Sequence, residues 1–339
     1  MTEVVRWRSG EIRAFDEQPS QSFIGPGAQL VGQRPIPTAA PTRHRRNATA
    51  GLAPVSGPEV LADTLRCGAA TDVGLVREAN EDAHLAAAPV FVVADGMGGH
   101  DAGDVASGYV IEEFTGFATE GLVDPEAVAA AIEERLRAVC DRIAAFDAEQ
   151  HAAGSPDFSA GTTAALAVAT GSGEDARWVV ANVGDSRVYC LDEDGLVQVT
   201  TDHSLVQELV DEGRIRADEA SLHPARNVVT RALGVSAMDQ PDFFSLPMRP
   251  GQRLLLCTDG VNGLIDDVVI ADVLATWSDP YLAAERLVAA ALEAGGHDNA
   301  TAVVVDVVGW AHGPTDDHDL NVDSDTARRG PQEKRGARP

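Results

Sequence analysis

One long segment of the chain repeats its apolar side chains with the period of a helix. The apolar positions after residue 125 follow one another at steps of three or four, and they are Val128, Ile132, Leu136, Val139, Ile143 and Phe146. This spacing places them on a single stripe of a helix. Asp124 is a typical N-cap and Pro125 suits the first helical position. We therefore predict a long helix that covers one face of a sheet.

Short apolar runs predict strands through the rest of the chain. Consecutive runs occupy residues 162–170, 177–183, 187–191 and 196–200. The links between them are short, and short links join only antiparallel neighbours, because a parallel crossover needs a dozen or more residues. Further strands are expected at 89–94, 252–258 and 301–308, with helices at about 267–277 and 280–294. The pattern indicates an α+β fold with helices packed on antiparallel sheets.

The two ends of the chain carry no sustained apolar period. Residues 1–61 are rich in Pro, Gly and Arg, and residues 311–339 are short of apolar residues and highly charged. We expect both to be disordered, and we expect one folded domain over residues 62–310. Residues 1–60 hold five acidic residues and seven arginines, and residues 311–339 hold six acidic and five basic residues. Subtracting their net charges of +2 and −1 from the −27 of the whole chain leaves −28 on residues 61–310, so the acidity belongs to the folded part.

So acidic a surface argues against two classes of partner. It would repel phosphate backbones and anionic lipid, which argues against a nucleic-acid binder or a polybasic membrane anchor. The sequence has no apolar run near 18 residues and no apolar signal core at its N-terminus. We therefore expect a cytoplasmic protein that needs no membrane.

Three aspartates stand at the ends of the most apolar predicted strands. Asp95 follows residues 91–94, Asp259 follows residues 254–258, and Asp298 shortly precedes residues 301–305. Each alone reads as an ordinary turn residue. All three beside Gly-containing loops suggest a converging oxygen-rich site, because a buried carboxylate needs a partner or a cation. The four cysteines lie too far apart in sequence for a zinc motif. Mg²⁺ or Mn²⁺ would suit such a site, with the Gly96 carbonyl as a further ligand.

Several short motifs now resemble one family. Residues 71–83 and 93–100 resemble the opening of metal-dependent serine/threonine protein phosphatases of the protein phosphatase 2C (PPM) type. Further matching motifs follow in the family's order at residues 161–163, 182–187, 201–204, 258–260 and 297–301. The resemblance covers about residues 65–308 and fits the bacterial branch best. It implies an α/β/β/α sandwich of two antiparallel sheets flanked by helices.

The resemblance also implies roles for individual residues. Asp95 would bridge two metal ions, the Gly96 carbonyl would complete the first site, Asp259 and Asp298 would hold the second ion, and Asp82 would act through water. Arg77 would grip the substrate phosphate, since a guanidinium fork matches phosphate oxygens; without the resemblance it reads as a solvated surface residue. Glu81 would support the site.

Four further positions keep two interpretations each. Asp157 would help to hold a third metal ion or is an exposed loop residue. His100 is a candidate acid for the leaving group or a structural histidine, since Met97 stands where animal members carry a histidine. Metal-bound water is another candidate for the acid that protonates the leaving group. Asp185 and Arg187 flank a hairpin turn, and this position favours a structural salt bridge over a catalytic role.

Residues 204–235 look like the family's flap beside the active site. Their arginines, Arg214, Arg216, Arg226 and Arg231, would contact phosphopeptide or pair with the acidic surface. The implied function is hydrolysis of phosphoserine and phosphothreonine on proteins by two Mn²⁺ or Mg²⁺ ions, with a third allowed. The expected partners are phosphorylated proteins and bacterial Ser/Thr kinases, and the chain is expected to be a monomer. Alternatives are a phosphatase dedicated to one regulatory partner, or a pseudo-phosphatase that binds phosphoproteins without turnover.

Overall fold

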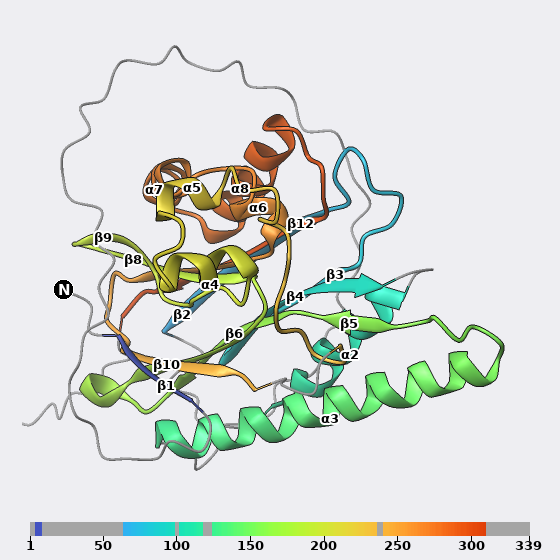
Figure 1. The fold of residues 1–339 in the computed structure, drawn as a ribbon. Helices are drawn as coiled ribbons and strands as arrows, with labels where there is room; N and C mark the ends of the chain where they lie inside the picture. The colour runs from blue at the N-terminus through green and yellow to red at the C-terminus, as the bar shows by residue number, and fades with distance from the viewer. Residues whose placement is uncertain (1–3, 9–63, 99–101, 118–123, 236–239, 310–339) are drawn as a thin grey trace, which may run out of the picture.

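Two antiparallel β-sheets lie face to face at the centre of the molecule (Figure 1). The computed structural model describes residues 4–8, 64–98, 102–117, 124–235 and 240–309. The larger sheet has the order β1-β10-β7-β6-β4-β3, with β5 paired to β4, and the smaller has the order β2-β12-β11-β8-β9. The strands of the larger sheet are β1 (Val5–Arg8), β3 (Asp82–Ala87), β4 (Val90–Gly98), β5 (Ala160–Thr162), β6 (Ala164–Thr170), β7 (Arg177–Val183) and β10 (Asp242–Pro247). Those of the smaller sheet are β2 (Leu65–Asp72), β8 (Arg187–Asp192), β9 (Gly195–Gln198), β11 (Arg253–Cys257) and β12 (Ala300–Val307).

Helices cover the outer face of each sheet. The larger sheet packs against α2 (Ala102–Phe114) and α3 (Pro125–Ala152), and the smaller one against α6 (Asp259–Asn262), α7 (Asp267–Thr276) and α8 (Pro280–Glu293). A middle core that includes Phe91, Trp178 and Leu254 fills the space between the sheets. The prediction of an α+β sandwich with the layers α/β/β/α is confirmed. Among the described residues, no helix is both long and apolar enough to cross a bilayer.

The long helix forms where the apolar stripe predicted it. The Asp124 carboxylate caps α3 by accepting the Glu126 N–H at 3.3 Å. The stripe residues Val128, Ile132, Leu136, Val139 and Ile143 are buried, and Phe146 packs at the edge of the same core. The predicted strand at 162–170 is divided at Thr163 into β5 and β6. This division turns β5 toward the end of β4.

The N-terminal segment corrects one prediction. Residues 5–8 fall in the range 1–61 that we expected to be disordered, yet they form β1 on the edge of the larger sheet. The strand is ordered because it pairs with β10, more than 230 residues further along the chain. Residues 9–61 and 311–339 lie outside the described residues, so the proposed domain boundaries stay predictions.

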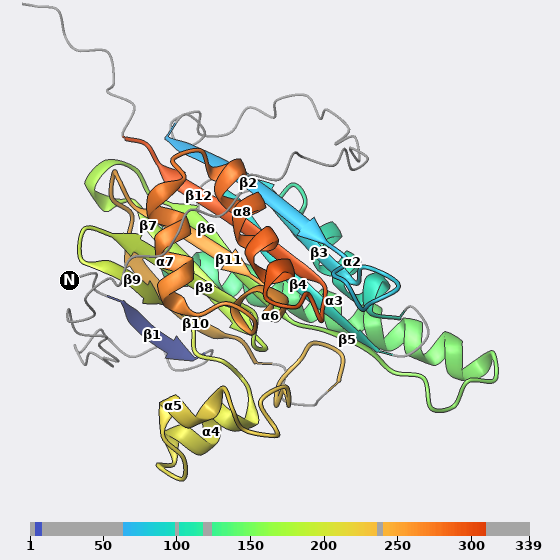
Figure 2. The same ribbon diagram turned by 90° about the horizontal axis from the view of Figure 1, so that it is seen from above.

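The flap, residues 204–235, carries two short helices. They are α4 (Leu205–Asp211) and α5 (Ala217–Ala220). Figure 2 shows them standing off the edge of the two sheets. The stem that leaves the flap returns to the larger sheet, where Leu233 forms a β-bridge with Thr162.

Candidate active site

Four aspartates from distant parts of the sequence meet at one end of the sandwich. Asp82 begins β3 and lies directly opposite Asp95 on β4. Asp259 begins α6 just after β11, and Asp298 precedes β12. The charges of Asp82, Asp259 and Asp298 all act on the Asp95 carboxyl, so the predicted acidic residues do converge.

We call the four aspartates Asp82, Asp95, Asp259 and Asp298 the acidic group. Two threonine hydroxyls bind one carboxylate oxygen of Asp82 within it. Thr258 Oγ1 and Thr301 Oγ1 donate hydrogen bonds to Asp82 Oδ2 at 2.8 and 2.7 Å. The other oxygen, Asp82 Oδ1, is buried and has no hydrogen-bond partner among the described residues, and the same is true of Asp259 Oδ1. Buried carboxylate oxygens are normally satisfied. Two unpartnered ones in one acidic group fit the needs of a hard divalent cation.

Burial and, after it, mutual repulsion raise the pKa values of these acidic residues. Burial is the largest cause for Asp82, whose pKa rises to about 7 against the two threonine hydrogen bonds, with added repulsion from Asp259 and Asp298. Burial and the charges of Asp82 and Asp259 raise the pKa of Asp95 well above its ordinary value. The pKa of Asp259 is also raised, by burial and by Asp298. A bound cation would reverse these shifts, because it favours the ionised form of each carboxyl.

Within the described ranges, side chains alone do not complete a metal site, because no group of three or more His, Cys, Asp or Glu side chains could hold a metal ion. Any ion here therefore needs other oxygen ligands, such as the Gly96 carbonyl or water. Gly96 packs so closely on α2 that a Cβ atom would lie 2.1 Å from the Gly103 carbonyl oxygen, which explains why glycine occupies this position.

The Gly-Thr-Thr motif fixes the backbone of Asp95. Thr163 Oγ1 accepts the Asp95 N–H at 3.0 Å, and the Thr163 N–H donates to the Asp95 carbonyl at 2.9 Å. Thr162 Oγ1 donates to the same carbonyl at 3.0 Å. Sequence reasoning found this motif but assigned it no role.

Arg77 lies on an exposed loop at the rim of the acidic group. Its Nη2 donates to Asp298 Oδ2 at 2.8 Å, while about half of its side chain stays exposed. Arg77 therefore lies beside the acidic residues, and its role in binding the substrate phosphate stays a prediction. Glu81 lies underneath, where its carboxylate accepts the Gly103 N–H at 3.2 Å and its carbonyl accepts the Gly96 N–H at 3.2 Å.

Asp185 is a member of the acidic group that sequence reasoning missed. We expected it to pair with Arg187, but Arg187 makes hydrogen bonds of 2.7 to 3.1 Å to the Asp202 carboxylate instead. Asp185 is buried, and its pKa rises to about 7 because of burial and the charge of Asp259. Its position in a Gly-Asp-Ser turn between β7 and β8 was the available signal.

The remaining candidates lie elsewhere. Asp157 is exposed on the loop between α3 and β5, so its part in a third metal site stays a prediction. His100 lies outside the described residues. On the flap, Arg214 pairs with Glu212 and Arg216 with Asp218. These two pairs lie within the flap itself, so both interpretations of the flap arginines, contact with phosphopeptide and pairing with the acidic surface, stay predictions.

Comparison with known proteins places the chain in a family. A model of the protein phosphatase 2C family matches residues 76–294. The serine/threonine protein phosphatase PstP of Mycobacterium tuberculosis is 40% identical over 257 residues, which are 74% of this chain and 46% of that protein. The serine/threonine phosphatase stp of Listeria welshimeri is 34% identical over 244 residues, covering 70% of this chain and 93% of that protein.

Solved structures agree with the sequence matches. The crystal structure of the Mycobacterium tuberculosis phosphatase PstP/Ppp covers 72% of this chain and 99% of its own, with a TM-score of 0.65 and 38% identity. The PstP catalytic domain in complex with two manganese ions has a TM-score of 0.61 and 36% identity, with coverages of 72% and 99%. This chain spans about half (46%) of the length of full PstP. These matches confirm the resemblance that the motifs gave: the chain belongs to the protein phosphatase 2C family, among relatives that are bacterial serine/threonine phosphatases.

Proposed function

We propose that this chain is a Mn²⁺- or Mg²⁺-dependent phosphatase that removes phosphate from serine and threonine side chains of proteins. The observation that carries the proposal is the pair of buried, unpartnered oxygens, Asp82 Oδ1 and Asp259 Oδ1, within one acidic group. Family membership supports the same reaction class. When bound, two divalent ions would lower the pKa of water and neutralise charge on the phosphoryl group.

Different residues of the chain would bind the ions and orient the attacking water. Asp95 and the Gly96 carbonyl, with Asp259 and Asp298, would hold the ions, and Asp82 would orient a water molecule. The threonine hydroxyls fix Asp82, so its free oxygen is already directed when substrate arrives. Asp157 is the candidate for a third ion. The two manganese ions bound to the PstP catalytic domain support the first two ions and do not bear on the third.

Arg77 is our candidate for substrate phosphate binding. Its half-exposed guanidinium stands beside Asp298 and has further N–H groups to offer. A planar fork can bind two phosphate oxygens at once, which positions the ester for attack. His100 and water remain the two candidates for protonating the leaving alkoxide.

The substrates we propose are phosphorylated proteins, with bacterial Ser/Thr kinases as the opposing enzymes. The Mycobacterium tuberculosis relative is a serine/threonine protein phosphatase, which supports protein substrates and identifies no specific partner. A cytoplasmic location and a monomeric state stay predictions from the sequence.

Phosphate release tests the proposal. The full chain is assayed with p-nitrophenyl phosphate and with a phosphothreonine peptide, after chelation and again after Mn²⁺ is restored. We expect turnover to be lost with the chelator and regained with Mn²⁺. Peptide binding without any turnover under all conditions would reject the enzyme and favour a phosphoprotein-binding module.

A further inference from the structure

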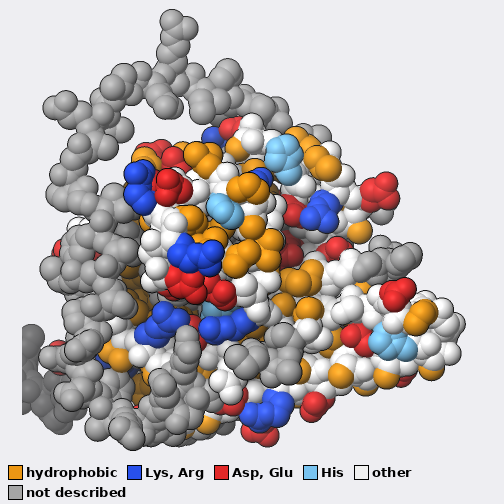
Figure 3. Space-filling view, in the orientation of Figure 1, with side chains coloured by type: hydrophobic (Ala, Val, Ile, Leu, Met, Phe, Trp, Pro, Cys, Tyr) orange, Lys and Arg blue, Asp and Glu red, His pale blue; other side chains and the backbone are white. Residues whose placement is uncertain are grey.

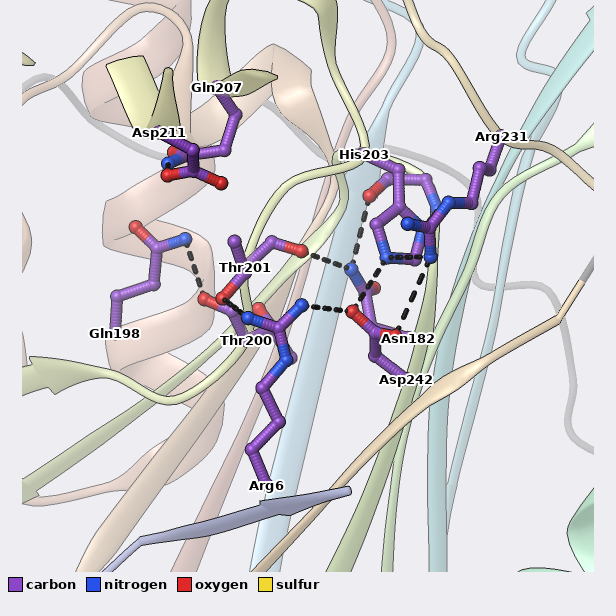
Figure 4. A network of polar contacts seen from close by, with 11 residues as sticks. Arg6, Asn182, Gln198, Thr200, Thr201, His203, Gln207, Asp211, Arg231 and Asp242 are labelled. Atoms are coloured by element: carbon purple, nitrogen blue, oxygen red, sulfur yellow. Dashed lines mark hydrogen bonds and ion pairs between the residues drawn. The ribbon is translucent and has the colours of Figure 1, made fainter. Parts of the chain in front are cut away.

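A second buried carboxylate, Asp242, lies away from the acidic group and binds three segments of the chain (Figure 4). It begins β10 and only 1% of it is exposed. His203 Nε2 lies 3.2 Å from its Oδ2, and Arg231 Nη1 lies 3.5 Å from its Oδ1. Arg6 Nη2, from the N-terminal strand β1, donates to Oδ2 as well.

His203 and two arginines surround the Asp242 carboxylate. The Gly184 N–H donates to His203 Nδ1 at 3.2 Å, and His203 Nε2 lies 3.2 Å from Asp242 Oδ2 and 3.1 Å from Arg231 Nη1. Arg6 and Arg231 both form ion pairs with the carboxylate. Burial would raise the pKa of Asp242, but the His203 hydrogen bond and the Arg6 charge leave it well below its ordinary value.

His203 and Arg231 stand at the two stems of the flap. Ser204, the N-cap of α4, follows His203, and a β-bridge joins it to Val229. The Thr230 N–H donates to the His203 carbonyl at 2.8 Å. Asp242 therefore holds the point where the chain enters the flap and the point where it leaves.

The flap stems connect directly to the acidic group. Beyond Arg231, Leu233 exchanges backbone hydrogen bonds of 2.9 and 3.1 Å with Thr162, whose hydroxyl holds the Asp95 carbonyl. On the other side, the His203 N–H donates to the carbonyl of Gly184, the neighbour of Asp185. A displacement of the stem at Leu233 would therefore reach Asp95 through Thr162. A displacement of the stem at His203 would reach Asp185 through Gly184.

Arg6 is supplied to this network by the N-terminal strand. Trp7 stacks on Phe243 with ring centroids 5.8 Å apart, which seats β1 on β10. The Arg6 guanidinium lies over the Phe244 ring at 5.6 Å, and its Nη1 donates to Thr201 Oγ1 at 3.3 Å. Arg6 thus bridges Asp242 and the segment that leads into the flap.

Acidic residues of α4 and its C-cap, Glu212, lie beside the Asp242 network. The residues that line a cavity of about 260 Å³ include Arg6, His203 and Arg231 together with the acidic Glu208, Asp211 and Glu212. Figure 3 shows acidic side chains grouped over α4 with basic side chains above and below them. Charge attraction across this cavity would hold the flap helix toward the arginines.

We propose that β1 is an intramolecular clamp on the flap, and that Arg6 is a positioning residue for the binding of protein substrates. The substrate part of this inference rests on the proposed phosphatase function. In this proposal a protein substrate contacts the flap as it reaches the acidic group, whereas a small phosphoester needs only the acidic group and Arg77. Loss of the clamp should therefore change peptide binding and leave small-substrate chemistry in place.

The test compares Arg6→Ala, Arg6→Lys and Trp7→Ala with the matched control Arg137→Ala, whose exposed side chain pairs with Glu133 on α3. Hydrogen–deuterium exchange is measured over residues 203–231, together with KM and kcat for a phosphothreonine peptide and for p-nitrophenyl phosphate. We expect Arg6→Ala to speed exchange in both stems at least threefold and to raise the peptide KM about three- to tenfold. The kcat for p-nitrophenyl phosphate should stay within about twofold of the unmodified chain.

The other variants sharpen the result. Arg6→Lys should give a smaller change, because an ammonium cannot reach Asp242 and Thr201 as a fork. Trp7→Ala should speed exchange in the same stems although it leaves the Asp242 network chemically intact. Unchanged exchange over 203–231 in Arg6→Ala or in Trp7→Ala would overturn the clamp, as would equal losses of kcat with both substrates. The exchange result stands even if the unmodified chain shows no turnover, so the two proposals fail separately.

Discussion

Asp82 and Asp95 lie directly opposite each other on the paired strands β3 and β4. Like charges in this position normally destabilise a sheet. The chain places Asp259, Asp298 and Asp185 around the same pair, so the repulsion is concentrated at one end of the sandwich. Such a group is costly for the metal-free fold and is explained by the cations that we propose it binds.

Replacing one member of this pair should stabilise the metal-free protein. We expect Asp95→Asn to raise the free energy of unfolding by about 1–3 kcal/mol at pH 7.5 in the presence of a chelator, because the amide carries no charge into the group. Urea denaturation of both proteins measures the difference. Asp175→Asn, at an exposed position, is the control and should change stability little. A less stable Asp95→Asn protein would show that the carboxylates are satisfied without a cation.

Stability should also depend on pH in a definite direction. The pKa of Asp82 and that of Asp185 are raised to about 7, so the folded state holds these protons more tightly than the unfolded chain, in which the ordinary value is 3.8. Their contribution to stability is complete below about pH 4 and is lost as the pH rises through about 7.

We therefore expect the Tm of the chelator-treated protein to fall between pH 5.5 and pH 7.5. Added Mn²⁺ should raise the Tm more at pH 7.5 than at pH 5.5, because ionised carboxylates bind it better. Thermal denaturation at both pH values, with and without Mn²⁺, provides the measurement. An equal Mn²⁺ effect at the two pH values would contradict the idea that these acidic residues bind the ion.

Local sequence signals predicted most of the fold. The α3 helix follows from its cap and apolar stripe, and the antiparallel strands β6 to β9 follow from their short links. The strand β1 could not be predicted, because four residues of mixed character form a strand only through pairing with a distant edge. The sequence also does not indicate which carboxylate Arg187 binds. It lies two residues from Asp185 in the sequence, yet it binds Asp202.

The site was predictable as a set of residue types rather than as a set of contacts. Carboxylates at strand ends pointed to Asp95, Asp259 and Asp298, and the family motifs added Asp82 and Arg77. The threonines that orient Asp82 and Asp95 come from three separate strand ends, and nothing local in the sequence indicates which carboxylate each one contacts. Those contacts depend on how the two sheets stack.

Arg77 should contribute to phosphate binding. We expect Arg77→Ala to raise the KM for a phosphothreonine peptide and the inhibition constant of inorganic phosphate about tenfold or more, which is the usual effect of losing a charged hydrogen bond. Arg77→Lys should recover only part of the affinity, because an ammonium lacks the fork. Steady-state kinetics with phosphate as inhibitor measure both values. Equal phosphate inhibition of Arg77→Ala and the unmodified chain would remove Arg77 from the site.

Thr258 should hold the site together through two hydrogen bonds. Its hydroxyl donates to Asp82 Oδ2 and accepts the Thr301 N–H at 3.0 Å. We expect Thr258→Val to lower the free energy of unfolding by about 1–3 kcal/mol, because it leaves a buried N–H without an acceptor. Thr258→Ser keeps the hydroxyl and should be close to the unmodified protein. Equal stability of the Val and Ser variants in urea would mean that neither hydrogen bond matters.

We propose that these distant aspartates form one cation-dependent catalytic centre. This claim is tested most directly by phosphate release from a phosphothreonine peptide as a function of Mn²⁺ concentration, for the unmodified chain, Asp259→Asn and the control Asp175→Asn. We expect saturable activation by Mn²⁺ in the unmodified chain and the control. Asp259→Asn should lose about a thousandfold in turnover, equivalent to about 4 kcal/mol of transition-state stabilisation, while remaining folded. Turnover in Asp259→Asn equal to that of the control, or independent of Mn²⁺ in the unmodified chain, would contradict the claim.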